Sequence, residues 1–302
     1  MNPILRRVSH SVGRRLPPGI AWRLRFLNGH RRWPRLSPPR TQNEKILWQI
    51  LYDRRPELVT CTDKLRAKQM VEAKCTRVRV PTTFWSGEDL GELAEVDLPD
   101  RWVLKPNNAC GLVIEGNGSL SSDEAHSIAE RTRDWLNGPL DPETAWRWPW
   151  AYSQVRPCFL VEEFVGEELG QLDFRGFVIG GELRAILVTW RVTEYPHGEC
   201  SFYDPEFNLL PVSRIEKPIA LSRPVEPIDG FREAVEEVAA TTGLDSLRVD
   251  LFHSGGEFWF GETTVYPLDG LVQYWPRSFD FELGTYWPDQ ERLLDSAKPV
   301  KA

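Results

Sequence analysis

The 302-residue sequence has no long hydrophobic run. No apolar stretch approaches the ~20 residues that a membrane-spanning helix needs. The opening stretch MNPILRRVSHSVGRRLPPG lacks the apolar core and the small-residue cleavage site of a secretory signal peptide. The five cysteines are scattered and include no C-x-x-C pair, so the sequence predicts neither a disulfide framework nor a zinc site. Together these absences predict a cytoplasmic protein.

The motifs of covalent catalysis and of the common phosphate-binding loops are also missing. The chain has no G-x-x-x-x-G-K-[ST] loop, no G-x-G-x-x-G fingerprint and no G-x-S-x-G elbow. Its five histidines have no metal-ligand spacing, and no cysteine–histidine nucleophile pair is supported. Glu162 and Glu163 are adjacent in a predicted strand, so they point to opposite faces and form no glycosidase carboxylate pair. The pattern favours chemistry that depends on bound phosphate and metal.

Acidic residues are absent from the first 43 positions, which contain ten arginines. The other residues carry 27 basic and 44 acidic side chains, a net charge of −17. This basic arm could lie on an anionic membrane surface, contact another macromolecule, or fold back onto the acidic body, and the last interpretation is favoured. We therefore expect a cytoplasmic protein, either free or peripheral to the inner membrane face. The acidic body argues against a nucleic-acid function for the whole chain.

Helical and strand patterns both occur along the chain. Apolar periodicity predicts four helices, over residues 43–53, 62–74, 121–136 and 229–243. Strand patterns cover residues 78–85, 158–165 and two hairpins, 172–192 with a Gly-Gly turn and 246–264. Helices mixed with antiparallel hairpins predict an α+β fold. Residues 28–43, rich in proline and arginine, are expected to form an extended linker.

The stretch WVLKPNNACG places a cation directly after a predicted buried strand. Lys105 follows the apolar residues 102–104 and precedes a proline, two asparagines and a glycine. A lysine at a strand end can simply reach toward water. Alternatively, its ammonium group and the amides of the following loop form a site for an anion. The stretch by itself does not decide between these two interpretations.

The hairpin RVDLFHSGGEFWFGETT carries a second group of charges. A three-residue turn, Ser254-Gly255-Gly256, would place Asp250 opposite Phe260 and Arg248 opposite Glu262. One face would then hold Arg248, Asp250, Glu262 and Thr264, and the other would hold Val249, Leu251, Trp259 and Gly261. A two-residue turn would instead shift the register by one and send Glu262 to the opposite face.

With the three-residue turn, the Cα atoms of Asp250 and Glu262 would be diagonal neighbours about 7–8 Å apart. Two carboxylates at that spacing repel each other unless a cation lies between them, and hard oxygen ligands suit Mg²⁺. The alternative is an ordinary cross-strand ion pair between Arg248 and Glu262 on a solvated face.

In sequence order, the motifs TDKLRAK, RVPTTFW, WVLKPNNACG, FLVEEFV, LDFRGFVIGGEL, RVDLF and FGETT resemble the ATP-grasp superfamily. Within it, NEKILWQILYDRRPELVTCTDKLRAK and LRVDLFHSGGEFWFGETTVYPLDG are similar to the TupA-like branch, named for teichuronopeptide biosynthesis. The resemblance implies two α+β subdomains that clamp a nucleotide behind a short basic arm. The implied parts are the arm (1–43), a helical or α+β segment (44–100), a small subdomain (101–165) and a large subdomain with the late hairpin (166–302).

The resemblance also implies a site for ATP. Lys64 and Lys105 would contact the α- and β-phosphates. Residues 107–111, among them Asn107, Asn108 and Gly111, would form a loop over the β- and γ-phosphates. The adenine would meet the strand residues Glu162, Glu163, Phe164 and Val165. Arg175 would match a basic residue near the phosphates.

For metal and catalysis, the resemblance implies Mg²⁺ ligands at Asp250, Glu262 and Thr264. Arg248 and Lys105 would act as catalytic cations that stabilise the transferred phosphoryl group. Two positions depart from the family pattern, because the phosphate loop holds a single glycine and Thr264 replaces the usual asparagine. These departures leave open a nucleotide-binding protein without turnover.

The implied activity is ATP-dependent ligation of a carboxylate to an amine through an acyl-phosphate. The substrates would be a small or polymeric carboxylate and an amine from cell-surface polymer or secondary-metabolite assembly. A glycosyltransferase of polysaccharide biosynthesis is the alternative enzyme, since that label is also used for the branch.

Overall fold

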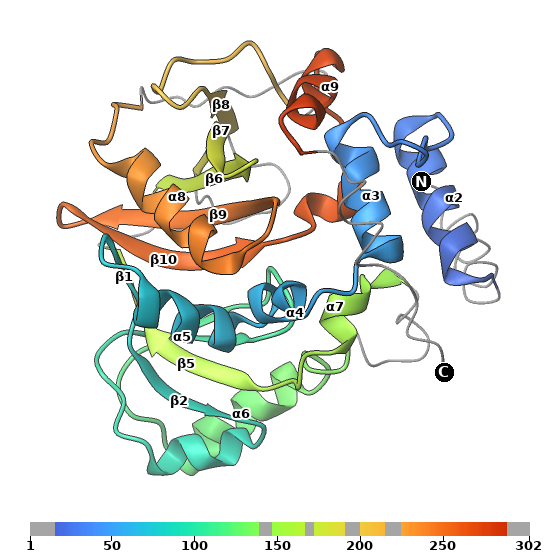
Figure 1. The fold of residues 1–302 in the computed structure, drawn as a ribbon. Coiled ribbons are helices and arrows are strands. Elements are labelled where there is room, and N and C mark those ends of the chain that lie inside the picture. Colours follow the sequence, from blue (N-terminus) through green and yellow to red (C-terminus); the bar gives the residue numbers. More distant parts are fainter. Residues whose placement is uncertain (1–15, 139–146, 167–171, 191–199, 215–224, 289–302) are drawn as a thin grey trace.

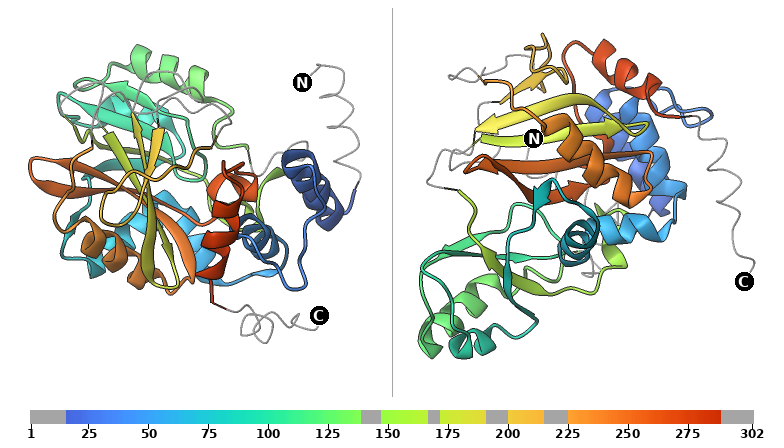
Figure 2. Two further views of the ribbon diagram at one scale, coloured as in Figure 1. Left: turned by 90° about the horizontal axis from the view of Figure 1, so that it is seen from above. Right: turned by 60° about the vertical axis from the view of Figure 1, so that its left-hand side comes forward.

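The computed structural model describes residues 16–138, 147–166, 172–190, 200–214 and 225–288. Two β-sheets form its framework (Figure 1). The larger sheet has six strands in the order β1-β10-β9-β6-β7-β8, and the smaller has four in the order β2-β5-β3-β4. In the right-hand view of Figure 2 the smaller sheet and its covering helix form a separate lobe beneath the larger sheet. The α+β fold predicted from the sequence is confirmed.

The strands of the larger sheet are β1 (Val78–Arg79), β6 (Leu172–Ile179), β7 (Glu182–Trp190), β8 (Cys200–Tyr203), β9 (Ser246–Ser254) and β10 (Glu257–Thr264). Those of the smaller sheet are β2 (Thr83–Gly87), β3 (Trp102–Pro106), β4 (Ile114–Gly116) and β5 (Phe159–Glu163). The helices are α2 (Pro18–His30), α3 (Gln42–Tyr52), α4 (Pro56–Thr62), α5 (Lys64–Lys74), α6 (Ser122–Thr132), α7 (Trp150–Ser153), α8 (Phe231–Thr242) and α9 (Ser278–Thr285), with 3₁₀ turns η1 (Leu90–Glu95) and η3 (Pro267–Gly270).

Helix boundaries follow from capping side chains. Thr41 and Glu44 form a reciprocal capping box at the start of α3, and Ser121 and Glu124 do the same for α6. The carboxylate of Asp63 accepts the first amides of α5, which fixes the start of the helix that carries Lys64. All four predicted helices are present, with ends within a few residues of the predicted ones.

The smaller sheet has one apolar and one polar face. Trp102 and Leu104 of β3 and Phe159 and Val161 of β5 are buried against α6 and η1. Lys105 alternates with these residues, so it points to the opposite face, toward α5 and the larger sheet. The lysine that ends the apolar run therefore shares a face of the smaller sheet with Glu162, which also contacts Lys68 of α5.

The larger sheet is apolar on the side that α8 covers. Val249, Leu251 and Phe260 pack there against Val235 and Val238 of the helix, as the amphipathic pattern predicts. On the opposite face of the sheet, the side chains of β6 change from charged to apolar along the strand. Its end near the Gly-Gly turn contributes the buried residues Phe177 and Ile179 to a second core, whereas its beginning carries the charged residues Asp173 and Arg175. Charges therefore gather at one end of this face.

The described part of the basic arm folds back onto the body. Helix α2 covers residues 18–30 and irregular structure connects it to α3. The linker predicted over residues 28–43 is therefore shorter, because its first three residues belong to α2 and its last two to α3. Arg25 pairs with Asp269 at 3.0 Å, and Arg32 pairs with Glu44.

Both β1 and β2 come from the segment 44–100 but lie in different sheets, and the four-part division of the chain stays a prediction.

Candidate active site

The late hairpin has a shorter turn than predicted. Ser254 pairs with Glu257, and Gly255 and Gly256 alone form the turn, with φ angles of 61° and 76°. Positive φ at both central positions is typical of a type I′ turn, which glycine adopts without steric cost. The predicted three-residue turn is therefore wrong, and a two-residue turn alone would have sent Glu262 to the far face.

A β-bulge at Gly261 reverses this effect. The register shifts between Phe260 and Glu262, so that Glu262 lies directly opposite Asp250, and Thr264 lies opposite Arg248. The extra residue returns Glu262 to the face of Asp250 and Arg248. The predicted pairs of Asp250 with Phe260 and of Arg248 with Glu262 are therefore wrong, because Asp250 pairs with Glu262 and Arg248 with Thr264.

The opposite face also differs from the prediction. Trp259 pairs with Phe252 and does not share the face of Val249 and Leu251. Arg248 and Asp250 are 8% and 4% exposed, so this cluster is not an ion pair on a solvated surface.

Gly261 is required by the close approach of the two strands. A Cβ atom at this position would lie 2.9 Å from the backbone oxygen of Asp250 and 3.2 Å from the ring of Phe252. We expect Gly261→Ala to lower the free energy of unfolding by about 1–3 kcal/mol, because the backbone cannot move aside without breaking the ladder. Urea denaturation measures this change. In Gly29→Ala the new Cβ would meet only ordinary contacts, the nearest at 3.5 Å, and this variant should be as stable as the wild type or slightly more stable.

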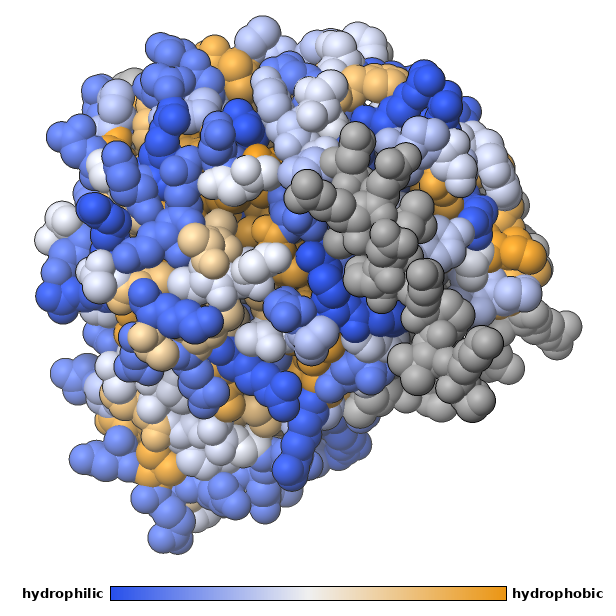
Figure 3. All heavy atoms as spheres, viewed as in Figure 1, coloured by the Kyte–Doolittle hydropathy of each residue, from blue (hydrophilic) through white to orange (hydrophobic). Residues whose placement is uncertain are grey.

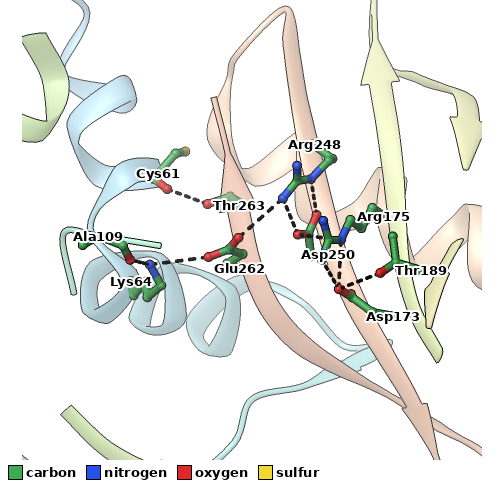
Figure 4. A network of polar contacts seen from close by, with 10 residues as sticks. All are labelled: Cys61, Lys64, Ala109, Asp173, Arg175, Thr189, Arg248, Asp250, Glu262 and Thr263. Carbon is green, nitrogen blue, oxygen red and sulfur yellow. Dashed lines mark hydrogen bonds and ion pairs between the residues drawn. The ribbon is translucent and has the colours of Figure 1, made fainter. Parts of the chain in front are cut away.

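Cations and carboxylates alternate across this face (Figure 4). The Arg248 guanidinium donates to both oxygens of Asp250, each at 2.6 Å, and lies 3.5 Å from Glu262. Arg175, directly opposite Asp250 on β6, lies 3.8 Å from it. From α5, the ammonium of Lys64 lies 3.4 Å from Glu262. The site is therefore built by the β9–β10 hairpin together with β6 and α5, which are distant from the hairpin in sequence.

The pKa values of the two opposed carboxyl groups are shifted in opposite directions. Burial opposes ionisation of both. At Glu262 the cations Lys64 and Arg248 outweigh burial and lower the pKa of the carboxyl. At Asp250 burial dominates and raises the pKa, despite the forked bond from Arg248. An added cation between them would favour the ionised form of both groups.

The donor set fits a magnesium ion that also takes phosphate oxygens. Asp250 and Glu262 supply hard carboxylate oxygens from opposed positions, and Thr264 lies on the same face. Within the described ranges, no group of three or more histidine, cysteine, aspartate or glutamate side chains could hold a metal ion. A site with two carboxylates suits Mg²⁺, which usually binds one or two carboxylates and completes its shell with water and phosphate.

A second cluster joins two lysines and one glutamate, of which Lys105 and Glu162 come from the smaller sheet and Lys68 from α5. Glu162 accepts from Lys68 at 2.6 Å through one oxygen and from Lys105 through the other. Burial opposes ionisation of Glu162, but Lys105 and Lys68 outweigh burial and lower its pKa. Lys105 also helps to lower the pKa of Glu262, which places it within electrostatic range of the opposite sheet.

The loop after β3 begins with a structural residue. The side chain of Asn107 donates to Asp63 and to the Arg156 carbonyl and accepts from the Cys158 amide, and its own carbonyl accepts from the Lys64 amide. Asn107 is only 1% exposed. Its side chain thus fixes the loop to the start of α5 and is occupied by protein partners.

The next residue of the loop, Asn108, differs from Asn107 in its hydrogen bonding. Asn108 is fully buried, and both polar atoms of its amide have no hydrogen-bond partner in the part of the chain that the structure describes. The Ala109 carbonyl accepts from the ammonium of Lys64, and Gly111 has a φ of 74°, which favours glycine. A buried amide without partners is costly unless a bound group satisfies it.

The predicted adenine-binding strand separates its two glutamates, as expected. Glu162 points toward the lysines, whereas the carboxylate of Glu163 accepts from the Thr82 amide at 3.0 Å on the neighbouring strand end. Beyond the strand, the Arg101 guanidinium lies 3.7 Å from the ring centre of Phe164, and Val165 is half-buried. These positions leave the adenine assignment a prediction.

Two residues of the site were missed in the sequence. Asp173 accepts from Arg175 at 2.8 Å and fixes its guanidinium, and its signal was the spacing of two residues on one strand face. Lys68 follows Lys64 by one helical turn, and that shared face was the only signal for its role.

Comparison with known proteins gives one family match. The profile of the TupA-like ATP-grasp family matches residues 44–287. A search of the curated proteins gives no match.

Several solved structures are similar in fold. The L-amino acid ligase from Bacillus licheniformis is 12% identical, with 94% of this chain and 62% of that chain covered and a TM-score of 0.49. The D-alanine–D-alanine ligase from Bacillus anthracis complexed with ATP is 15% identical, with 79% and 65% covered and a TM-score of 0.42. The ATP-grasp ligase PsnB complexed with a minimal precursor is 14% identical, with 74% and 60% covered and a TM-score of 0.40. The matched region thus spans 60–65% of the length of these chains.

Proposed function

The chain belongs to the TupA-like ATP-grasp family, and from this premise we propose that it is an ATP- and Mg²⁺-dependent carboxylate–amine ligase. One observation carries the proposal. Two lysines from α5 and β3 face two opposed carboxylates of the β9–β10 hairpin across the space between the sheets, and Lys64 and Lys105 both lower the pKa of Glu262. Cations on one side and hard oxygen ligands on the other are what a metal-bound triphosphate needs.

In this proposal each part of the site has a role toward ATP. Lys64 and Lys105 bind the α- and β-phosphates, and Asn108 and Gly111 of the loop approach the β- and γ-phosphates. The buried, unpartnered amide of Asn108 supports this placement. Asn107 contributes by fixing the loop, because its own amide is occupied.

The hinge is proposed to lie at the end of β5. Glu163, Phe164 and Val165 would meet the adenine through backbone and side-chain groups. Glu162 would act through Lys68 and Lys105, since both of its oxygens are engaged by these lysines. It is therefore a positioning residue for the phosphate-binding cations.

Asp250, Glu262 and Thr264 would hold Mg²⁺, which neutralises phosphate charge when bound. Arg248 and Arg175 would then lie beside the transferred γ-phosphoryl group. Asp250 and Asp173 fix the two guanidinium groups, so little reorganisation is needed as negative charge develops. Charge stabilisation and positioning account for most of the catalysis of phosphoryl transfer.

The reaction balances in two steps. A carboxylate oxygen of the first substrate attacks the γ-phosphorus, ADP leaves, and an acyl-phosphate forms. An amine then attacks the acyl carbon, inorganic phosphate leaves, and the amine loses a proton as the amide forms. Neither step needs a nucleophilic side chain, which agrees with the absence of nucleophile motifs in the sequence. We propose substrates from cell-surface polymer or secondary-metabolite assembly, as the family resemblance suggests.

Phosphate release tests this proposal. With ATP, Mg²⁺ and pooled amino acids, uronic acids and peptides, we expect release of phosphate together with an amide product. Lys105→Ala should lower the rate by about 10²-fold, because one phosphate-binding cation is lost. The matched control is Lys74→Ala at the end of α5, an exposed lysine that should leave the rate unchanged.

Other results would support different functions. Release of UDP from a sugar nucleotide would support glycosyl transfer. ATP binding without turnover in all pools would support a non-catalytic nucleotide-binding protein. The single glycine of the loop and Thr264 in place of asparagine favour this second candidate.

A further inference from the structure

Helix α2 of the basic arm is apolar on two faces. Its inner face packs onto the body through Ala21, Trp22 and Phe26, which are at most 4% exposed. Its outer face carries Ile20, Leu24 and Leu27, which are 45%, 40% and 36% exposed. Spacings of four and three residues place these three side chains in one stripe. A helix on the surface of a soluble domain normally presents polar residues outward.

The stripe has apolar and aromatic neighbours in the sequence and in space. Trp33, just after the helix, is 56% exposed, and Tyr52 of α3 is 41% exposed and accepts a hydrogen bond from Arg23 of α2. Apolar side chains gather at the right-hand edge of the molecule in Figure 3, where α2 lies in Figure 1. Several exposed apolar side chains on one element indicate an interaction surface.

Basic residues lie in and just after this helix in the sequence, and not all of them are neutralised. Arg25 and Arg32 are paired with Asp269 and Glu44. Arg31, Arg35 and Arg40 are exposed and make no ion pair with any described residue. The arm as a whole contains ten arginines and no acidic residue. Its apolar stripe is thus combined with positive charge.

We propose that α2 docks the protein on an anionic lipid surface. Ile20, Leu24 and Leu27 would enter the acyl boundary, Trp33 would lie at the headgroup level, and Arg31, Arg35 and Arg40 would pair with lipid phosphates. The helix would lie in the interface, because its 13 residues span about 20 Å, less than the about 30 Å of the hydrocarbon core. None of the described helices is long and apolar enough to cross a membrane.

The observations favour lipid over other partners. Nucleic acid would use the arginines but leave the leucine stripe in water, and the body carries a charge of −17. A second copy, bound through a two-fold axis, would bring two arginine-rich arms together. An anionic lipid surface satisfies both the apolar stripe and the positive charge.

Vesicle sedimentation with the full chain tests the proposal. We expect the wild type to pellet with vesicles of phosphatidylcholine containing about 30% phosphatidylglycerol, and not with phosphatidylcholine alone. The double variant Leu24→Glu/Leu27→Glu should reduce the vesicle-bound fraction at least about tenfold, because both leucines lose their apolar environment. Both positions lie on the outer face, at 40% and 36% exposure, so the double variant should still unfold in a single cooperative thermal transition, which shows that it is folded.

Matched variants show whether vesicle binding depends on this surface and on its charge. Leu209→Glu, at a 64% exposed leucine on the body, should bind vesicles like the wild type. Arg31→Glu/Arg35→Glu should also weaken binding, and raising the salt from about 0.1 M to about 0.5 M should do the same.

The proposal is overturned if the wild type fails to pellet with anionic vesicles, or if the leucine double variant binds as well as the wild type. A dimer in analytical ultracentrifugation that the leucine variant abolishes would mean that a second copy covers the stripe. Tighter binding to an oligonucleotide than to vesicles, unchanged in the leucine variant, would mean that the arm is a nucleic-acid contact.

Discussion

Glu262→Gln is expected to reduce Mg²⁺-dependent release of phosphate from ATP by about 10³-fold, with little change in the fold. The substitution keeps the shape of the side chain but removes one of the two opposed carboxylates, and a single carboxylate holds the ion weakly. Loss of the charge stabilisation that a metal supplies is worth several kcal/mol, which corresponds to this factor. Metal titrations of the rate should also show a higher Mg²⁺ requirement in the variant.

The same strand provides the control for this experiment. Glu257 begins β10, is 43% exposed and pairs with Arg79 away from the site. Glu257→Gln should leave the rate and the Mg²⁺ requirement unchanged. Equal rates for Glu262→Gln and the wild type would show that the proposed metal position is wrong, even if ATP turnover itself were observed.

Glu162→Gln should have the largest effect on stability. We expect the free energy of unfolding to fall by about 3 kcal/mol, because two lysines would share a buried space without a negative charge. Lys68 is 4% exposed, and burial already lowers its pKa even with Glu162 present. The affinity for ATP should also fall, since Lys105 loses the partner that positions it. Urea denaturation and nucleotide titration measure the two effects.

The exposed pair of Glu88 and Arg156 gives the matched control. Its side chains are 59% and 86% exposed, so Glu88→Gln should change the stability by less than about 1 kcal/mol. If the two glutamate variants had equal stability, the buried cluster would not contribute to folding.

The pH dependence of the Glu162 effect has a definite sign. Its pKa is lowered in the folded state relative to the ordinary 4.5, so the folded state favours the ionised form. The stability from Glu162 is therefore complete above pH 4.5 and is lost as the pH falls toward the folded-state pKa. The difference between the wild type and Glu162→Gln should be full at neutral pH and shrink under acid.

The sequence by itself determined the elements and the chemical groups of the site. Alternation in β3 placed Lys105 opposite the apolar residues, because successive strand side chains point to opposite faces. Periodicity predicted the helix that carries Lys64 over residues 62–74, and the structure begins this helix at Lys64, after the Asp63 cap. The order of these motifs was enough to predict the family.

Only the tertiary structure decided how these groups meet. The turn is one residue shorter than predicted, and the bulge at Gly261 shifts the register by one more residue in the same direction. A total shift of two residues keeps Glu262 on the face of Asp250, because side chains alternate with a period of two, and it brings Glu262 directly opposite Asp250. Neither irregularity changes the hydrophobic pattern, which is why the sequence did not reveal them. The partners of Glu162 likewise come from a helix and a strand far apart in sequence, so the contact of Glu162 with Lys68 exists only once α5 packs between the two sheets.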